Sequence, residues 1–154
     1  MIADFALNPE AVAAGGNAVG KGGILDRLAD VFARAYSLDA AMVREGLDER
    51  EKLGSTGFGR GVAIPHARIE GINRPIAALL RLDSPVDFNA ADGMPVDLVF
   101  GLLSPVGSGA AHLHALAALS RLTRDEEMRE ALADAPDADA LFALITNVAD
   151  RDAA

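Results

Sequence analysis

The run that decides the fold class of this chain is PVDLVFGLL, residues 95–103. It carries a single charged residue, Asp97, and it is closed by Ser104 and Pro105. A nearly continuous apolar run predicts a strand that is covered on both faces, because a half-exposed strand alternates apolar and polar side chains. We therefore expect a central strand here, with other elements packed on each side of its sheet.

Two shorter apolar runs precede this strand. They span residues 61–64, where Pro65 ends the run, and residues 76–82. Residues 89–93, between the second run and the central strand, are rich in the asparagine, aspartate and glycine that form turns. The middle of the chain is therefore predicted to be mainly strand.

Helical patterns surround the strands. Apolar residues recur at helical spacing over residues 24–35. A second helix is expected to begin near Asp39, a good N-cap, and to end in the charged cluster at residues 48–52. Residues 1–22 are punctuated by glycine pairs, which predicts an irregular entry segment.

The C-terminal third predicts three further helices. The first is expected over about residues 108–122. The second should begin at Thr123, because Thr123 and Glu126 have the spacing of a capping box. The third follows Pro136. The whole pattern predicts a single α/β domain over residues 1–154, with a mixed sheet of about five strands flanked by helices.

The composition excludes several classes of function. The chain has 154 residues, 51% hydrophobic and 24% charged, which fits one globular domain. Its net charge of -9 argues against nucleic acid and anionic membranes as partners, because both need clustered basic residues. The absence of cysteine excludes thiolate catalysis and cysteine-based zinc sites. No apolar run approaches the roughly 20 residues that span a bilayer, so we expect a cytoplasmic protein without membrane insertion.

The three histidines are the candidate reactive groups. His66 follows a short strand and Pro65, so it should lie at a strand end, where α/β proteins place catalytic groups. Neutral imidazole is a competent nucleophile near pH 7. The preceding Gly57, Gly59 and Gly61 would let an anion approach the backbone. The alternative is a structural histidine over a glycine-rich hairpin.

Other catalytic motifs do not match. A dinucleotide-binding loop would need glycine in place of Val62, and no glycine-lysine-serine/threonine sequence forms a P-loop. Ser108 does not lie in the Gly-x-Ser-x-Gly pattern of a serine hydrolase. Nucleotide binding and serine hydrolysis are therefore disfavoured.

His112 and His114 diverge if their segment is helical, because two residues turn a helix by about 200°. The helical pattern puts His112 at the border of the buried face and His114 in solvent. Rings that diverge in this way are poor ligands for one ion, and neither a metal nor a cofactor is expected. His112 near a helix N-terminus is well placed beside an anion, although a partly buried structural histidine fits equally well.

Two segments resemble a known family. Residues 50–68, REKLGSTGFGRGVAIPHAR, resemble the active-site segment of fructose/mannitol-type enzyme IIA domains of the bacterial phosphoenolpyruvate-dependent phosphotransferase system. Residues 95–116 resemble that family's central strand and second-histidine helix. The His-Leu-His sequence and the free-standing length look most like the nitrogen-regulatory branch. The resemblance covers about residues 24–146.

The resemblance implies roles for individual residues. His66 would be phosphorylated through Nε2, His112 would support the phosphoryl group, and Arg50 would lie near it. Thr56 lies in the same loop and would also contact the phosphoryl group. His114 would replace His112 if the helix register differs. Taken alone, Arg50 fits a solvated helix-end charge and Thr56 a turn former.

The resemblance also implies partners. The donor would be the phosphohistidine of HPr or its nitrogen-branch counterpart, docked on an apolar rim that includes Phe58, Ile64 and Ile69. The output would be regulatory, through targets such as kinases or transporters. Two alternatives remain open: a sugar-transport enzyme IIA that passes the phosphoryl group to a IIB domain, and a binding module without phosphotransfer.

Overall fold

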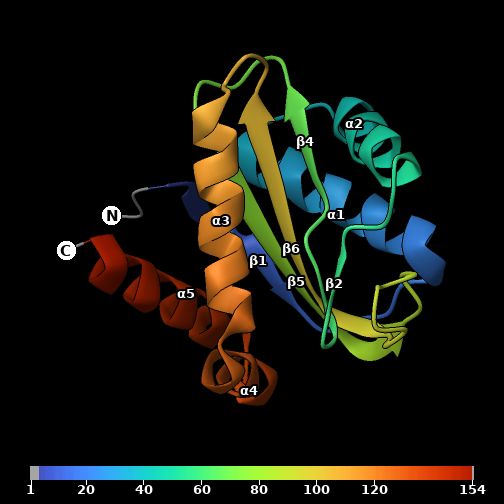
Figure 1. Ribbon diagram of the computed structural model, residues 1–154, viewed down its shortest axis with the longest axis vertical. Coiled ribbons are helices and arrows are strands. Elements are labelled where there is room, and N and C mark those ends of the chain that lie inside the picture. Colours follow the sequence, from blue (N-terminus) through green and yellow to red (C-terminus); the bar gives the residue numbers. More distant parts are fainter. Residues whose placement is uncertain (1–3, 154) are drawn as a thin grey trace.

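The computed structural model of the protein describes residues 4–153, with side chains up to residue 147 (Figure 1). A mixed sheet forms its centre, and helices cover both faces. The elements in chain order are β1 (Ala6–Ala14), α1 (Gly20–Tyr36), α2 (Ala40–Lys52), β2 (Gly57–Gly59), β3 (Val62–Ala63), β4 (His66–Ile69), β5 (Ile76–Val86), β6 (Val96–Pro105), α3 (Ala110–Arg124), α4 (Glu126–Asp134) and α5 (Ala138–Ala153).

The sheet is built around β6, as the apolar run predicted. The strand order is β1-β5-β6-β3-β2, and β4 also pairs with β6. β6 is antiparallel to β5 and parallel to β3 and β4, so both of its edges are hydrogen-bonded. The predicted α/β class with a mixed, helix-flanked sheet is confirmed, and the sheet has six strands where about five were expected.

Alternate residues of β6 enter two separate cores. Val99 and Leu103 pack on the side of α1 and α2, whereas Phe100 and Leu102 pack on the side of α3, α4 and α5. Gly101 is required by the close approach of α1, because a Cβ atom there would lie 2.6 Å from the Phe32 ring. Burial on both faces explains why the run contains so few polar residues.

The prediction of an irregular segment over residues 1–22 is wrong for most of the residues that the structure describes there. Residues 6–14 form β1, which pairs with β5 in parallel, and α1 begins at Gly20. The register shifts between Leu7 and Val12, where Asn8, Pro9 and Glu10 interrupt the alternation of a regular strand. Because of this interruption, the alternation of apolar and polar residues did not predict the strand.

The predicted capping box is also wrong, whereas the Asp39 cap is confirmed. The Asp39 carboxylate accepts a hydrogen bond from the Ala41 amide at 3.0 Å. α3 continues to Arg124, and Asp125 caps α4 by accepting from two of its first amides. Thr123 lies buried inside α3, where its hydroxyl donates to the Leu119 carbonyl. The N-cap of α4 is therefore Asp125, two residues after the predicted Thr123.

Candidate functional site

His66 lies at the point where β3 ends and β4 begins along one edge of β6. β3 and β4 both run parallel to β6, and Pro65 lies between them. The Leu102 amide donates to the Pro65 carbonyl at 3.0 Å, which fixes the break against β6. His66 is therefore the first residue of β4, a strand that the sequence analysis did not predict; it expected His66 just after the end of a strand.

The hydrogen bonds of the His66 ring define its tautomer. Nδ1 lies 2.8 Å from the Ile64 carbonyl oxygen. A carbonyl can only accept, so Nδ1 carries the proton. Nε2 then has a free lone pair, which accepts a hydrogen bond from Arg50 Nε at 3.2 Å. This is the tautomer in which Nε2 is the nucleophilic nitrogen.

The surroundings of His66 keep it neutral. Burial lowers the pKa of His66, and the positive charges of Arg50 and Arg68 lower it further, against the opposing effect of the Ile64 carbonyl. A histidine with a lowered pKa is uncharged at neutral pH. Nε2 is therefore unprotonated at neutral pH, and its lone pair accepts the hydrogen bond from Arg50.

His112, and not His114, is brought to His66. The two ring centroids are 5.5 Å apart, and the planes are tilted by 48°. His112 is 3% exposed, while His114 lies exposed on α3, as the helical phase predicted. His112 Nδ1 is 2.6 Å from Ser104 Oγ on β6. Burial, together with the charges of Arg68 and His66, lowers the pKa of His112 to about 4.

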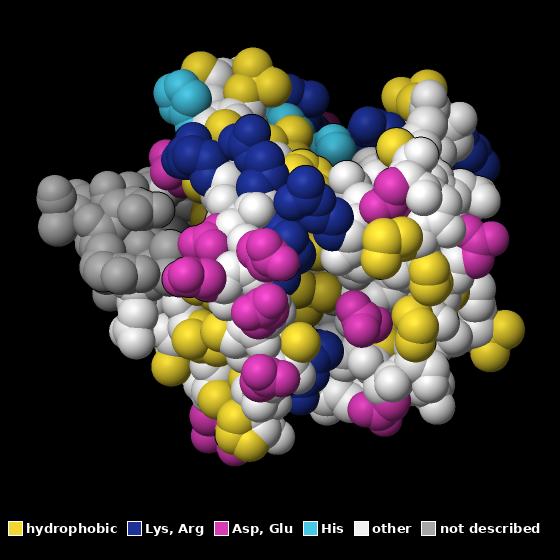
Figure 2. Space-filling view, turned by 60° about the horizontal axis from the view of Figure 1, so that its bottom comes forward, with side chains coloured by type: hydrophobic (Ala, Val, Ile, Leu, Met, Phe, Trp, Pro, Cys, Tyr) yellow, Lys and Arg dark blue, Asp and Glu magenta, His cyan; other side chains and the backbone are white. Residues whose placement is uncertain are grey.

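The two histidines and two arginines share a cavity of about 280 Å³. Arg50, in the last turn of α2, is anchored by its NH1 atom, which donates to the Gly54 carbonyl at 2.8 Å. Arg68 on β4 also lines the cavity, and sequence reasoning gave it no role. Lys and Arg side chains gather near the histidines on the surface (Figure 2). The cavity lining is Gly46, Glu49, Arg50, Leu53, His66, Ala67, Arg68 and His112.

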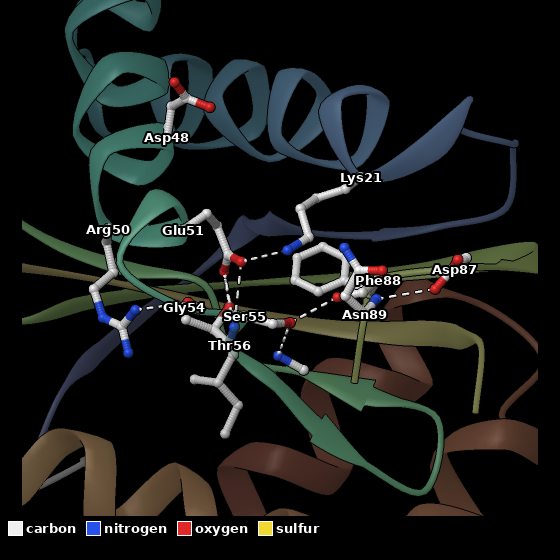
Figure 3. A network of polar contacts seen from close by, with 12 residues as sticks. Lys21, Asp48, Arg50, Glu51, Gly54, Ser55, Thr56, Asp87, Phe88 and Asn89 are labelled. Atoms are coloured by element: carbon white, nitrogen blue, oxygen red, sulfur yellow. Dashed lines mark hydrogen bonds and ion pairs between the residues drawn. The ribbon is translucent and has the colours of Figure 1, made fainter. Parts of the chain in front are cut away.

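Thr56 is not part of the lining of this cavity. Figure 3 shows it beside Glu51, in a network of polar contacts that includes Lys21. Its hydroxyl and its amide both donate to the buried carboxylate of Glu51. Glu51 also accepts from Lys21 Nζ at 2.9 Å, and that ammonium group lies 4.7 Å from the centre of the Phe88 ring. Thr56 therefore holds the turn that follows Arg50, and we assign it no contact with a phosphoryl group.

The glycine-rich hairpin packs against its own protein instead of forming an open anion cradle. A Cβ atom on Gly57 would lie 2.7 Å from the backbone of Ala90. The amide of Arg60, at the hairpin tip, donates to the Asp92 carboxylate at 2.7 Å. These glycines therefore permit close packing of the 88–92 loop, in agreement with the structural alternative for the hairpin.

The exposed apolar rim differs from the expected one. Ile64 and Ile69 are buried and cannot contact a partner, so that expectation is wrong; Phe58 is 37% exposed. Leu53, in the cavity lining, and Leu113, next to His112, are exposed instead. Ile64 lies between β3 and β4, and Ile69 alternates with the exposed Arg68 on β4; both isoleucines enter a core.

The comparisons with known proteins agree with this geometry. Residues 6–148 match the family described as "Phosphoenolpyruvate-dependent sugar phosphotransferase system, EIIA 2". The fold and the family match thus define the class: the chain belongs to this family of phosphotransferase-system components.

The relatives point to one branch of that family. The chain is 45% identical to a nitrogen regulatory protein of Pseudomonas aeruginosa over 81% of this chain and 82% of the relative. It is 42% identical to that of Bradyrhizobium diazoefficiens, covering 89% and 90%. The crystal structure of nitrogen regulatory protein IIA-Ntr from Neisseria meningitidis superposes with a TM-score of 0.84 at 36% identity, over 90% of this chain and 95% of that one.

Sugar-transport proteins also match. The fructose-specific EIIABC component of Bacillus subtilis is 37% identical over 81% of this chain, which covers 20% of that relative. The Escherichia coli enzyme IIAMTL, solved in complex with phosphorylated enzyme IIBMTL, shares the fold with a TM-score of 0.74 at 20% identity, over 93% of this chain and 99% of that one. None of the described helices is both long and apolar enough to span a membrane.

Proposed function

We propose that this protein is a cytoplasmic histidine phosphocarrier that accepts a phosphoryl group on Nε2 of His66 and has a regulatory output. The proposal rests on the tautomer of the His66 ring and on the groups that contact its two nitrogens. Nδ1–H is held by a carbonyl, and the Nε2 lone pair meets Arg50 at a cavity shared with His112 and Arg68. A half-buried, neutral nucleophile beside cationic groups suits the transfer of a dianionic group.

His66 does not have to lose a proton in the transfer step. Nε2 of His66 attacks phosphorus, and the new N–P bond forms as the N–P bond of the donor phosphohistidine breaks. The donor nitrogen keeps the electron pair of the broken bond. His66 keeps its Nδ1 proton, and the positive charge that develops on its ring is stabilised by the Ile64 carbonyl.

The arginines neutralise the transferred charge. Arg50 Nε occupies the His66 lone pair in the free protein, so this hydrogen bond moves to a phosphoryl oxygen when phosphorus takes its place. The NH1 anchor on Gly54 keeps the guanidinium at the cavity during this exchange. Arg68 lines the same cavity and adds a second positive charge. Because both guanidinium groups already lie at the cavity, only the partner of Arg50 Nε has to change during the reaction.

The proposed donor is the phosphohistidine of an HPr-type protein, and the proposed targets are regulatory proteins such as kinases or transporters. Leu53 and Leu113 give the surface near the histidines apolar side chains for a partner. Phosphorylation adds about -1.5 to -2 charges to that surface, which changes the partners it accepts. The matches to nitrogen regulatory proteins over most of both lengths favour this output.

The test is phosphoryl transfer followed by intact mass at alkaline pH. The protein is incubated with phosphoenolpyruvate, enzyme I and an HPr-type carrier. We expect a mass gain of one phosphoryl group, absent in His66→Ala and retained in His114→Ala, the matched control on an exposed histidine. No mass gain, with a carrier that phosphorylates another enzyme IIA, would overturn the proposal and leave a phosphorylation-independent binding module.

The second candidate function is a sugar-transport enzyme IIA, favoured by the match to the fructose-specific relative. The phosphorylated protein is mixed with an isolated fructose-type IIB domain, and the phosphoryl group is followed by mass. Transfer to IIB at a rate similar to that of a fructose enzyme IIA would establish the sugar-transport function. A stable phosphoprotein in the presence of IIB would support the regulatory function.

A further inference from the structure

Ser104 is a buried polar residue to which the sequence motifs assign nothing. It lies near the end of β6 and is fully buried, and its hydroxyl is 2.6 Å from Nδ1 of His112. Among the described residues, the Ser104 hydroxyl makes no other hydrogen bond, and the His112 ring has no other hydrogen-bond partner. Each group therefore depends on the other for its only polar contact.

This isolation decides the direction of the hydrogen bond. A serine hydroxyl can donate or accept, but a buried O–H without an acceptor is costly. If His112 donated from Nδ1, the hydroxyl proton of Ser104 would have no acceptor. The arrangement that satisfies both groups has Ser104 donating to Nδ1. Neutral His112 then carries its proton on Nε2.

The charged groups around His112 do not replace this contact. Glu49 and Arg50 on α2, and His66 and Arg68 on β4, line the same cavity. None of them is hydrogen-bonded to the His112 ring, whose one hydrogen bond among the described residues is the one to Ser104. The hydroxyl on β6 is therefore the group that selects the tautomer.

We propose that Ser104 is a positioning residue, which donates to Nδ1 of His112 and so holds His112 as an Nε2–H donor for a phosphoryl group on His66. The inference rests on the phosphocarrier function proposed above. It makes the two rings complementary, because His66 presents a lone pair on Nε2 and His112 presents a proton on Nε2. Phosphoryl oxygens only accept hydrogen bonds, so the opposite tautomer of His112 would present a lone pair to them.

The first experiment measures the tautomer in the unmodified protein. Long-range ¹H–¹⁵N correlation spectra of ¹⁵N-histidine-labelled protein at pH 7 distinguish the two nitrogens of each ring. We expect His112 to be protonated on Nε2. A proton on Nδ1 of His112 would overturn the proposal, and this result does not depend on any variant being folded.

The second experiment compares initial rates of phosphorylation by the HPr-type carrier. Ser104→Ala is expected to be about tenfold slower, from the loss of one hydrogen bond, and to show both His112 tautomers. Ser104→Thr, which keeps the hydroxyl, should recover most of the rate. Ser108→Ala is the matched control, because the Ser108 hydroxyl is buried but has no hydrogen-bond partner among the described residues.

The outcomes separate the two proposals. If the unmodified protein is phosphorylated on His66 and Ser104→Ala reacts at the same rate with its fold intact, Ser104 has no positioning role, although the phosphocarrier function stands. If the unmodified protein is not phosphorylated at all, both proposals fail. If His112 still carried its proton on Nε2 in that case, the hydrogen bond between Ser104 and His112 would have a structural role and no role in phosphoryl transfer.

Discussion

His66 and His112 differ in the group that lies behind Nδ1. His66 faces the carbonyl of Ile64, which can only accept, whereas His112 faces the hydroxyl of Ser104, which can donate. A difference of one functional group gives neighbouring rings opposite tautomers, one suited to attack and the other to hydrogen-bond donation. The chemistry of the pair is thus set by contacts on the side away from the cavity.

A substitution can remove one of these two contacts but not the other. The partner of His66 is backbone, so no substitution of Ile64 removes its carbonyl. The partner of His112 is a side chain, so it can be removed or restored. Variants of the two histidines and their neighbours therefore test the roles separately.

The largest effect is expected from His66 itself. His66→Ala removes the only nucleophile that the account assigns, so phosphorylation should fall below detection by intact mass. His114→Ala, on an exposed histidine, should accept the phosphoryl group at the unchanged rate. Residual phosphorylation of His66→Ala at His112 would mean that the two rings are interchangeable, contrary to the account.

His112→Ala should leave the nucleophile in place but remove a donor to the phosphoryl group. Loss of one such donor lowers a rate by about 10²- to 10³-fold, so the initial rate of phosphorylation should fall by that factor. The final mass of the product should still correspond to one phosphoryl group. An unchanged rate would show that His112 is a structural histidine.

The pH dependence of stability should distinguish His112 from an ordinary histidine. Its folded pKa is about 4, against 6.5 unfolded, so the unfolded chain binds more protons between these values. The free energy of unfolding should therefore fall by about 3 kcal/mol as the pH drops from 6.5 to about 4, because one pKa unit corresponds to about 1.4 kcal/mol. Urea unfolding at several pH values measures this loss.

His112→Asn is the control for that measurement. It cannot titrate, so its free energy of unfolding should depend less on pH in the same window. His114→Gln should behave as the unmodified protein does. Parallel curves for the unmodified protein and His112→Asn would contradict a lowered pKa at His112.

The smallest effect is expected from Arg50→Lys. The lysine keeps the positive charge but loses the planar fork through which Arg50 holds Gly54 and His66 together. We expect the initial rate of phosphorylation to fall about tenfold, the equivalent of one hydrogen bond. Lys52→Ala, on an exposed lysine of the same helix, is the control. Equal rates in the two variants would remove Arg50 from the mechanism.

Much of the fold followed from local patterns. The continuous apolar run identified β6 as the central strand, and helical phase separated His112 from His114. Failures occurred where two local signals competed, as at Asp125 and Thr123, or where Pro9 interrupted the alternation in β1. The cap depends on where α3 ends, and β1 is fixed by its pairing with β5, which lies far away in the sequence.

The site was predictable only where it lay in a motif. His66 and Arg50 lie in one continuous segment, and the structure brings them together. Ser104 and Arg68 gave no signal, because their roles depend on β4 pairing with β6 and on α3 packing against β6. Thr56 was near in sequence but turns toward Glu51, a buried carboxylate whose position is set by Lys21 on α1.

The most direct test of the central claim is the position of phosphorus in the phosphorylated protein. Phosphorus–nitrogen couplings and long-range ¹H–¹⁵N correlations on ¹⁵N-histidine-labelled material identify both the residue and the nitrogen. We expect phosphorus on Nε2 of His66, with the proton retained on Nδ1 beside the Ile64 carbonyl. Phosphorus on Nδ1 of His66, or on either nitrogen of His112, would contradict it.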